Sequence, residues 1–232
     1  MQYVGKFDAK EINTDLIEKL DEKNFEQVPT LYIGLGGTGK DILLRMRENL
    51  FLKYEEKFKD DELFPIKFLY YDLDQKSAQY DDRGIYSDDY FKRFSFTDDE
   101  LLLIKPDTAK TLELIKKKQP NVSNISKWIS PGLQSMDTSI GAGQQRQISR
   151  LSFFTCYDEI ERAVKSKLRE LGTINTGTKH GSDQTFRIVL VFSVAGGTGC
   201  GSFVDMAFLC KQLLKDDSNT ANAKHEIISH VV

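Results

Sequence analysis

Short apolar runs and amphipathic stretches alternate along the chain, which predicts strands and helices in turn. The longest apolar run, 186–194, is rich in Val and Phe and is typical of a strand buried on both faces. The strands that we predict from such runs are 30–33, 66–71, 186–194 and 226–232. Apolar positions three and four residues apart predict helices over 41–57, over 147–171 and up to about 215. A capping box between Thr97 and Glu100 predicts a further helix that runs to 118.

The repeated order of strand, loop and helix determines the predicted fold class. Parallel strands joined through helices need right-handed crossovers, which place helices on both faces of the sheet. We therefore predict an α/β fold, a Rossmann-like three-layer sandwich with a mainly parallel sheet. The carboxyl ends of parallel strands lie at one edge of the sheet, so the loops that follow the strands are expected to build one site there.

Three of these loops are rich in glycine. Gly-Gly-Thr-Gly occurs at 36–39 and again at 196–199, each time between an apolar run and a helical pattern, and Ile140-Gly-Ala-Gly143 precedes another helix. Glycine lets the backbone approach a ligand with no Cβ in the way. The N-terminus of a helix offers unpaired N–H groups and a positive dipole end to an anion. Two such loops on one sheet predict a nucleotide held by its phosphates from two sides.

The candidate nucleotide-binding residues come from these loops and from the end of the second strand. They are Gly36, Gly37, Thr38, Gly39, Lys40, Asp41, Asp72, Asp74, Gly141, Ala142, Gly143, Gln144, Arg146, Ala195, Gly196, Gly197, Thr198, Gly199 and Gly201. For Asp72 and Asp74, a Mg²⁺-linked or ribose role competes with simple solvation of a strand end. Asp74 is the candidate metal contact, through a Mg²⁺–nucleotide complex. The alternative for the glycines is a tight turn or close packing, and for Lys40 a solvated side chain.

The first loop nearly satisfies two other nucleotide-binding motifs. Gly34-x-Gly36-x-x-Gly39 fits the dinucleotide fingerprint, but the acidic residue expected about 20 positions further on is missing. The same segment, continued through Lys40 and Asp41, fits the P-loop pattern except at its last position. There a hydroxyl should reach Mg²⁺, and a carboxylate stands instead. A deviant P-loop NTPase that depends on Lys40 is therefore the lowest alternative, because neither motif accounts for the other loops.

Taken together, four loops resemble those of the tubulin and FtsZ superfamily. Ala195-Gly-Gly-Thr-Gly-Cys-Gly201 is similar to the tubulin signature loop, G-G-G-T-G-[ST]-G. The segment 34–41, with Arg45-Met46 behind it, is similar to the first phosphate loop of FtsZ. Tyr71-Asp-Leu-Asp-Gln75 stands where that family carries its second loop, and Ile140-Gly-Ala-Gly143 resembles its third.

The resemblance spans about 30–232 and is to a bacterial tubulin-like protein rather than to eukaryotic tubulin or FtsZ itself. It implies a nucleotide-binding domain over 29–232 with an insertion at about 80–135, GTP or GDP with Mg²⁺ as ligands, and head-to-tail self-association into filaments or binding to another protein. It also implies that neighbouring subunits complete hydrolysis, and that the completing loop and the family's second domain lie beyond residue 232. We expect a polymerising GTPase or a nucleotide-dependent switch in the full-length form. The alternative is a non-hydrolysing nucleotide-binding scaffold.

Four residues depart from the family pattern or add to it. Ala195 and Cys200 replace a glycine and a hydroxyl residue of the signature, which leaves backbone amides to hold phosphate. Asp41 stands where FtsZ-like proteins often carry Asn near the nucleoside, so the guanine preference depends on it. Arg146 adds a positive charge to the third loop, where it either meets a terminal phosphate or is a surface residue at a helix start.

Composition argues against several classes of partner. The net charge of the 232 residues is −3, and basic and acidic residues are interleaved, which argues against nucleic acid. The three cysteines lack metal-ligand spacing, and no stretch approaches about 18 apolar residues. We therefore expect a cytoplasmic protein with neither a zinc site nor a membrane span. A polar helical arm is expected over 1–28, and the apolar strand at the end suggests the front part of a longer protein.

Overall fold

The computed structural model describes residues 28–55, 64–76, 84, 86–118, 123–130, 132–133, 141–173, 185–216, 221 and 223–232. Within them, one all-parallel sheet has the strand order β3-β2-β1-β4-β5. The strands are β1 (Thr30–Leu35), β2 (Ile66–Asp72), β3 (Leu101–Leu103), β4 (Thr185–Phe192) and β5 (Lys224–Val231). β2 and β3 are added in order on one side of β1, and β4 and β5 are then added on its other side. The switch point of the sheet therefore lies between β1 and β4.

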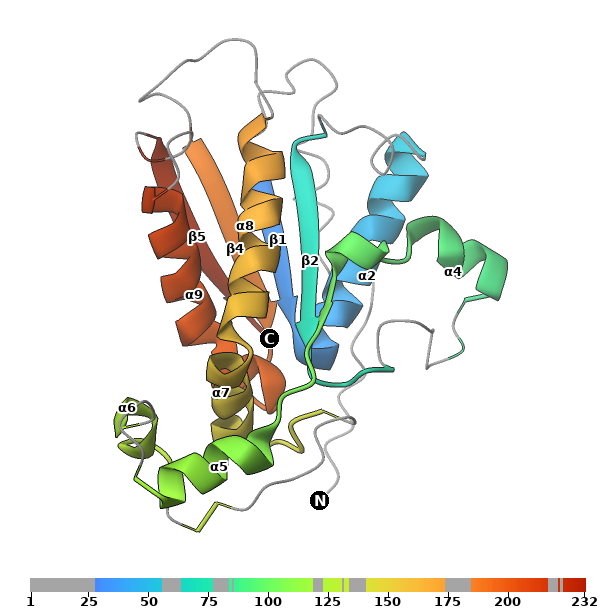
Figure 1. Ribbon diagram of the computed structural model, residues 1–232. Coiled ribbons are helices and arrows are strands. Elements are labelled where there is room, and N and C mark those ends of the chain that lie inside the picture. Colours follow the sequence, from blue (N-terminus) through green and yellow to red (C-terminus); the bar gives the residue numbers. More distant parts are fainter. Residues whose placement is uncertain are drawn as a thin grey trace, which may run out of the picture.

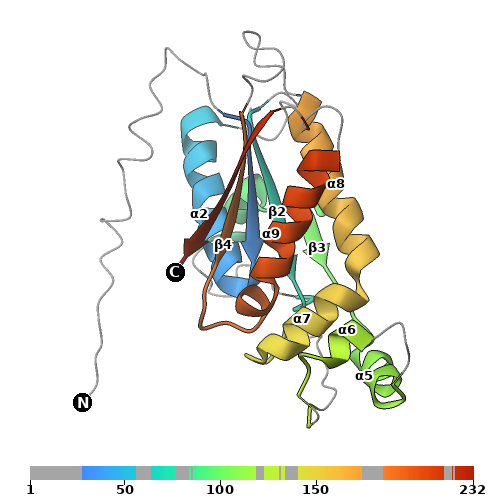
Figure 2. The ribbon, with the colours of Figure 1, turned by 90° about the vertical axis from the view of Figure 1, so that its left-hand side faces the viewer.

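Helices cover both faces of the sheet and complete a three-layer sandwich (Figures 1 and 2). On one face lie α2 (Gly36–Tyr54) and α4 (Asp88–Phe94), and on the other lie α8 (Tyr157–Thr173) and α9 (Thr198–Asp216). Three shorter helices lie near the end toward which the strands point: α5 (Thr108–Lys116), α6 (Ser123–Ser126) and α7 (Arg146–Thr155) (Figure 1). The predicted α/β fold class is confirmed.

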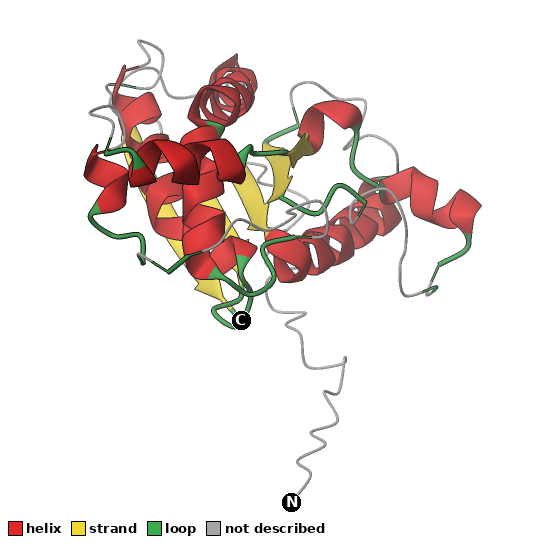
Figure 3. Cartoon of the chain, turned by 60° about the horizontal axis from the view of Figure 1, so that its bottom comes forward, coloured by secondary structure: helices red, strands yellow, loops and turns green. Residues whose placement is uncertain are grey.

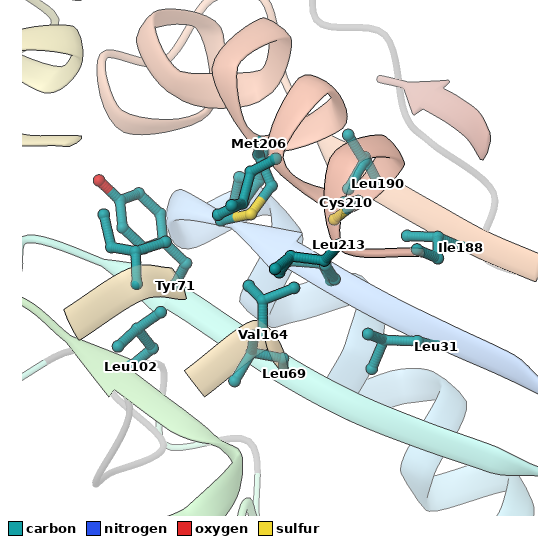
Figure 4. Close-up of a cluster of buried hydrophobic side chains, with 14 of the residues drawn as sticks. Leu31, Leu69, Tyr71, Leu102, Val164, Ile188, Leu190, Met206, Cys210 and Leu213 are labelled. Carbon is teal, nitrogen blue, oxygen red and sulfur yellow. The ribbon is translucent and has the colours of Figure 1, made fainter. Parts of the chain in front are cut away.

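The alternation of side chains along each strand divides the core into two parts. In β2, Leu69 and Tyr71 pack with residues of α8 and α9, whereas Phe68 and Tyr70 pack with residues of α2 and α4. Figure 4 shows the first of these parts, where Met206 of α9 lies over the sheet. Because both faces of the sheet are covered at its centre, β1, β2 and β4 have the mostly apolar character from which they were predicted.

The predicted strands agree with β1, β2, β4 and β5 to within two residues at each end. The two long helices that follow β1 and β4 begin earlier than the sequence pattern predicts. α2 begins at Gly36 rather than at 41, and α9 begins at Thr198, inside the glycine loop. The glycines of both loops thus lie in or next to the first helical turns, close to the strand ends.

The predicted helix over 97–118 is wrong. The capping box forms, with the Thr97 N–H donating to the Glu100 carboxylate at 2.8 Å, but it opens only a 3₁₀ turn, Asp98–Glu100. The leucines that follow pair with the end of β2 as the edge strand β3. The helix α5 begins separately, two residues after Pro106, because proline cannot supply the N–H that a helix interior needs.

The predicted helix over 147–171 is two helices, α7 and α8, which are separated at Cys156. Near the break, the hydroxyls of Ser152 and Thr155 donate to backbone carbonyls four residues earlier, at 2.7 and 2.8 Å. Such bonds compete with the helical ladder and bend helices. The break lets α8 cover the sheet while α7 lies at its carboxyl edge (Figure 1).

Some predictions fall wholly or partly outside the described residues. The arm expected over 1–28 does, apart from residue 28, and so does Ile140 of the third loop. The insertion expected at about 80–135 is described in part, and β3 within it belongs to the sheet. The domain boundaries stay a prediction. Among the residues that the structure describes, no helix has the length and apolar character to cross a membrane.

A buried arginine holds the segment before β3 onto α2. No helix was predicted in this segment, but it contains α4. Arg47, which is 1% exposed, donates to the carbonyls of Phe94 and Ser95 at 2.6 and 2.8 Å and to the Glu100 carboxylate at 2.6 Å. Burial lowers the pKa of the Arg47 guanidinium, and the neighbouring Glu100 partly offsets this effect.

Replacing Arg47 should therefore destabilise the fold strongly. We expect Arg47→Met to lower the free energy of unfolding by about 3 kcal/mol, because it leaves a carboxylate and two carbonyls without their donor. The matched control is Arg45→Met on the same helix, where the side chain is 57% exposed and pairs with Glu48. That change should cost less than about 1 kcal/mol. Urea unfolding of both variants measures the difference, and equal losses would contradict the structural role of Arg47.

Candidate functional site

The carboxyl ends of β1 and β4 lie side by side, and each leads into a long helix. Leu35 and Phe192, which end the two strands, are partners in the sheet register. α2 starts at the next residue after β1, and residues 193–197 connect β4 to α9. A Cβ placed on Gly36 would lie 3.3 Å from the Cβ of Thr198, so the two helix starts are in contact. Figure 3 turns this end of the molecule forward and shows helices on either side of the strands.

Close packing of the backbone requires some of the loop glycines. A Cβ on Gly39 would lie 2.7 Å from both the Val191 carbonyl oxygen and the Gly34 carbonyl carbon, so α2 touches β1 and β4 at backbone distance. A Cβ on Gly199 would lie 2.9 Å from the Leu35 carbonyl oxygen. These two glycines are explained by the fold itself, without a ligand.

The third loop packs directly against the signature loop. A Cβ on Gly197 would lie 2.9 Å from the Cβ of Ala142 and from the backbone nitrogen of Gln144. One helical turn later, a Cβ on Gly201 would lie 2.5 Å from the Arg146 carbonyl oxygen. The start of α7 is thereby fixed against the first turn of α9.

The third loop is itself a tight turn. The Gln145 N–H donates to the Ala142 carbonyl at 2.9 Å, and the two residues between them, Gly143 and Gln144, both have positive φ. Positive φ at both central positions is the pattern of a type I′ turn. Gly141, whose φ is +94°, lies beside the second loop, because a Cβ there would be 3.9 Å from the Cβ of Asp74. All four loops predicted from the sequence are thus neighbours.

Gly37 and Gly196 differ from the other glycines of these loops. A Cβ on Gly37 would meet no atom within 4 Å, and one on Gly196 would meet only the Ser193 carbonyl oxygen, at an ordinary 3.8 Å. Neither residue has positive φ. Packing and backbone conformation therefore leave both glycines unexplained. Close approach of a ligand is what glycine allows at such a position.

Three helices, α2, α7 and α9, begin at this edge without an acidic residue in the first turn. Neither α2 nor α7 has a side-chain hydrogen bond from its N-cap residue. The first four N–H groups of a helix have no partner within it, and the dipole makes this end positive. The edge therefore presents backbone donors and the positive ends of helix dipoles, which suit an anion.

The two acidic candidates have different surroundings. Asp72 is 3% exposed and accepts hydrogen bonds from the Tyr70 hydroxyl, the Leu73 N–H and the Thr198 hydroxyl. Asp74 is partly exposed, accepts from the Lys76 N–H at 3.0 Å and adjoins the third loop. Within the described ranges, no three His, Cys, Asp or Glu side chains cluster as a metal site. Of the two carboxylates, Asp74 is the more exposed at this edge, and its contact with a metal ion stays a prediction.

The first loop does not have the form of a P-loop. A P-loop wraps backbone N–H groups around phosphate between a strand and a helix, whereas here β1 passes into α2 without an intervening residue. Lys40 is 4% exposed inside this helix, and Asp41 and Thr38 are partly exposed on it. The geometry therefore disfavours the P-loop alternative.

Arg146 contacts the signature loop rather than only solvent. Its guanidinium donates to the Val194 carbonyl at 3.2 Å across the gap between the third and signature loops. Ala195, next in the chain, is exposed, and its N–H donates to the Ser193 hydroxyl at 3.2 Å. The positive charge predicted at the third loop thus lies beside the glycine turn.

Two serines fix the signature loop and were missed from the sequence. Ser149 of α7 and Ser202 of α9, both fully buried, donate to the Thr198 carbonyl at 2.7 Å each. Ser202 follows Thr198 by four residues, so a hydroxyl-to-carbonyl bond within α9 was readable from the spacing. Nothing in the sequence pattern connects Ser149 with this loop.

The comparison with protein families agrees with this arrangement. A family model described as tubulin-like matches residues 31–230, which include all four loops. The chain belongs to the tubulin-like family. A search of curated proteins finds no match. The predicted membership of the tubulin and FtsZ superfamily is confirmed, and the ligand contacts of the individual residues stay predictions.

In this tubulin-like protein, neighbouring glycines should respond oppositely to alanine. We expect Gly39→Ala to lower the free energy of unfolding by about 1–3 kcal/mol, because its Cβ meets backbone on two sides. Gly37→Ala should raise it by about 0.5–1 kcal/mol, since alanine favours a helix and its Cβ meets open space. Chemical unfolding without added nucleotide measures both. A destabilised Gly37→Ala variant would show that packing, not a ligand, requires this glycine.

Proposed function

We propose that this tubulin-like protein binds GTP and GDP, with Mg²⁺, at the switch point between β1 and β4. The observation that carries the proposal is the meeting of three helix starts, none with an acidic first turn, beside Gly37 and Gly196, where a Cβ would meet no atom closer than 3.8 Å. Unpaired N–H groups and positive dipole ends attract phosphate. A chain of phosphates can contact several helix N-termini at once, whereas a single small anion cannot.

The residues at this edge would divide the recognition of a nucleotide. The N–H groups in the first turns of α2 and α9 would hold phosphate oxygens. Arg146 donates one N–H to the Val194 carbonyl, and its guanidinium has further N–H donors for a terminal phosphate. Asp41 is partly exposed on α2, and its carboxylate accepts hydrogen bonds only. Guanine offers adjacent N1–H and N2–H₂ donors to such a group, and this supports the guanine assignment.

The carboxyl edge also suits a Mg²⁺–nucleotide complex. Mg²⁺ keeps several waters and is usually bound through one or two carboxylates together with substrate phosphates. Asp74, partly exposed beside the third loop, supplies one carboxylate there. When bound, the ion would neutralise part of the phosphate charge, and Asp74 would be the carboxylate that holds it.

We further propose that the full-length protein self-associates head to tail and that nucleotide regulates this contact. Val194 and Ala195 of the signature loop are exposed at the proposed phosphate site, so a neighbouring subunit at this edge would contact both loop and nucleotide. Loss of the terminal phosphate would then change the contact energy between neighbours. Nucleotide-dependent sedimentation of the full-length protein distinguishes this switch from a non-hydrolysing scaffold, which would bind nucleotide without assembling.

Nucleotide binding is tested directly by titrating the chain with labelled GTP, GDP and ATP, with and without Mg²⁺. We expect GTP and GDP to bind more tightly than ATP. Gly37→Ala and Gly196→Ala should each weaken binding by about tenfold or more, because a Cβ blocks the approach of phosphate to the backbone. Gly132→Ala is the matched control, since a Cβ there also meets nothing within 4 Å but lies outside the four loops.

Equal affinity of the two loop variants and the control would refute phosphate binding by these glycines. A preference for ATP would keep the site but reject the guanine assignment. In that case Asp41→Asn, which exchanges an acceptor oxygen for a donor NH₂, is the variant that tests whether Asp41 selects the base.

Cysteine labelling gives an independent measurement on the same protein. Burial raises the pKa of Cys156 to about 11 and that of Cys210 to about 12, whereas Cys200 lies partly exposed in the first turn of α9. Since the thiolate is the reactive form, iodoacetamide should modify Cys200 first. GDP should slow this reaction in proportion to the fraction of protein bound. Unchanged labelling at saturating GDP would place the nucleotide elsewhere, and Cys200→Ser identifies the labelled residue.

A further inference from the structure

The carboxylate of Asp72 accepts three hydrogen bonds beneath the loops. Its Oδ1 accepts from the Leu73 N–H at 2.7 Å and from the Thr198 hydroxyl at 2.8 Å, and its Oδ2 accepts from the Tyr70 hydroxyl at 2.6 Å. The residue is 3% exposed. A buried carboxylate is tolerated when several donors satisfy it, as these three do. At this burial, the Asp72 carboxylate has little surface left for contact with a metal ion or a ribose.

Thr198, the partner of Asp72 across 126 positions of sequence, is the first residue of α9. A hydroxyl has one proton, and that of Thr198 is given to Asp72, so it has none to donate to a phosphate. The Thr198 carbonyl meanwhile accepts from Ser149 and Ser202. The side chain and the main chain of Thr198 are therefore held from three elements, β2, α7 and α9.

We infer that Asp72 is a positioning residue of the nucleotide site, which acts through Thr198 and not by contact with metal or nucleotide. By anchoring the Thr198 hydroxyl to the end of β2, it fixes the first turn of α9 so that the N–H groups of this turn face outward. The inference rests on the proposed nucleotide binding and specifies how the signature loop is prepared for it. It leaves Asp74 as the carboxylate for Mg²⁺.

Conservative variants separate this role from metal binding. Asp72→Ala and Thr198→Val both remove the bond between the two side chains, and each should weaken GDP binding by about tenfold, with or without Mg²⁺. The double variant should bind GDP no more weakly than Asp72→Ala alone, because Thr198→Val then removes a bond that is already lost. Asp72→Asn should recover most of the affinity, since its amide oxygen still accepts from Thr198 while its NH₂ donates to Tyr70.

Tyr70→Phe is the matched control. It removes the donor to the other oxygen of Asp72 and leaves the bond to Thr198, so it should change GDP affinity less than Asp72→Ala does. If Asp72→Asn weakens GDP binding as much as Asp72→Ala does, and if both losses occur only in the presence of Mg²⁺, Asp72 is a metal ligand and the inference is overturned. Additive losses in the double variant overturn it as well, because they show that the two residues act independently.

Hydrogen exchange in the nucleotide-free protein keeps this inference distinct from the proposed function. Amides of 197–202 should exchange faster in Thr198→Val than in the starting protein, and Asp72→Asn should retain their protection. Unchanged exchange in Thr198→Val overturns the positioning role, whatever the nucleotide affinity. Faster exchange in a chain that binds neither GTP, GDP nor ATP supports the Asp72–Thr198 anchor and refutes the proposed function alone.

Discussion

The candidate site depends on one kind of contact: two helices pack against the sheet with no side chain between the backbones. Gly39 brings α2 against the backbone of β1 and β4, and Gly199 brings α9 against the end of β1. Because no side chain separates helix from strand, the first helical turns lie at the strand ends and the sheet fixes their N–H groups. Donors that are already oriented need no rearrangement when a charged ligand arrives. The glycines that build this contact are structural, whatever the ligand is.

Two buried charged side chains hold segments that hydrophobic packing alone does not specify. The Arg47 guanidinium donates hydrogen bonds to two backbone carbonyls and a carboxylate, and thereby fixes the chain between α4 and β3. Asp72 takes its hydrogen bonds from neutral donors and thereby fixes the signature loop. Burying either charge is costly unless its hydrogen bonds are satisfied. Each network is thus specific to one arrangement of its segment, because other arrangements would leave the charge without partners.

The sequence predicts the central strands well because β1, β2 and β4 are mostly buried and mostly apolar. β3 is three leucines after a capping box, and that local pattern favours a helix. Only pairing with β2, a contact distant in sequence, makes it a strand. The break at Cys156 was missed because the apolar periodicity continues from α7 into α8.

The glycine pattern also predicted which loops meet, since loops after parallel strands share an edge of the sheet. It does not distinguish Gly39, which packing requires, from Gly37, which faces open space, because both are glycines of the same motif. For the same reason, the sequence treats Asp72 and Asp74 alike. Burial and hydrogen bonding separate them, and both depend on the assembled fold.

The difference between buried and exposed positions explains how the loop tolerates its departures from the tubulin signature. Ala195 is exposed and Cys200 is partly exposed, whereas Thr198 is buried and bonded through both its hydroxyl and its carbonyl. A loop that binds phosphate through N–H groups depends on residues that set the backbone, and less on side chains that face solvent. The hydroxyl lost at Cys200 would have been one donor among several backbone donors. The hydroxyl of Thr198 is different, because the shape of the first turn depends on it.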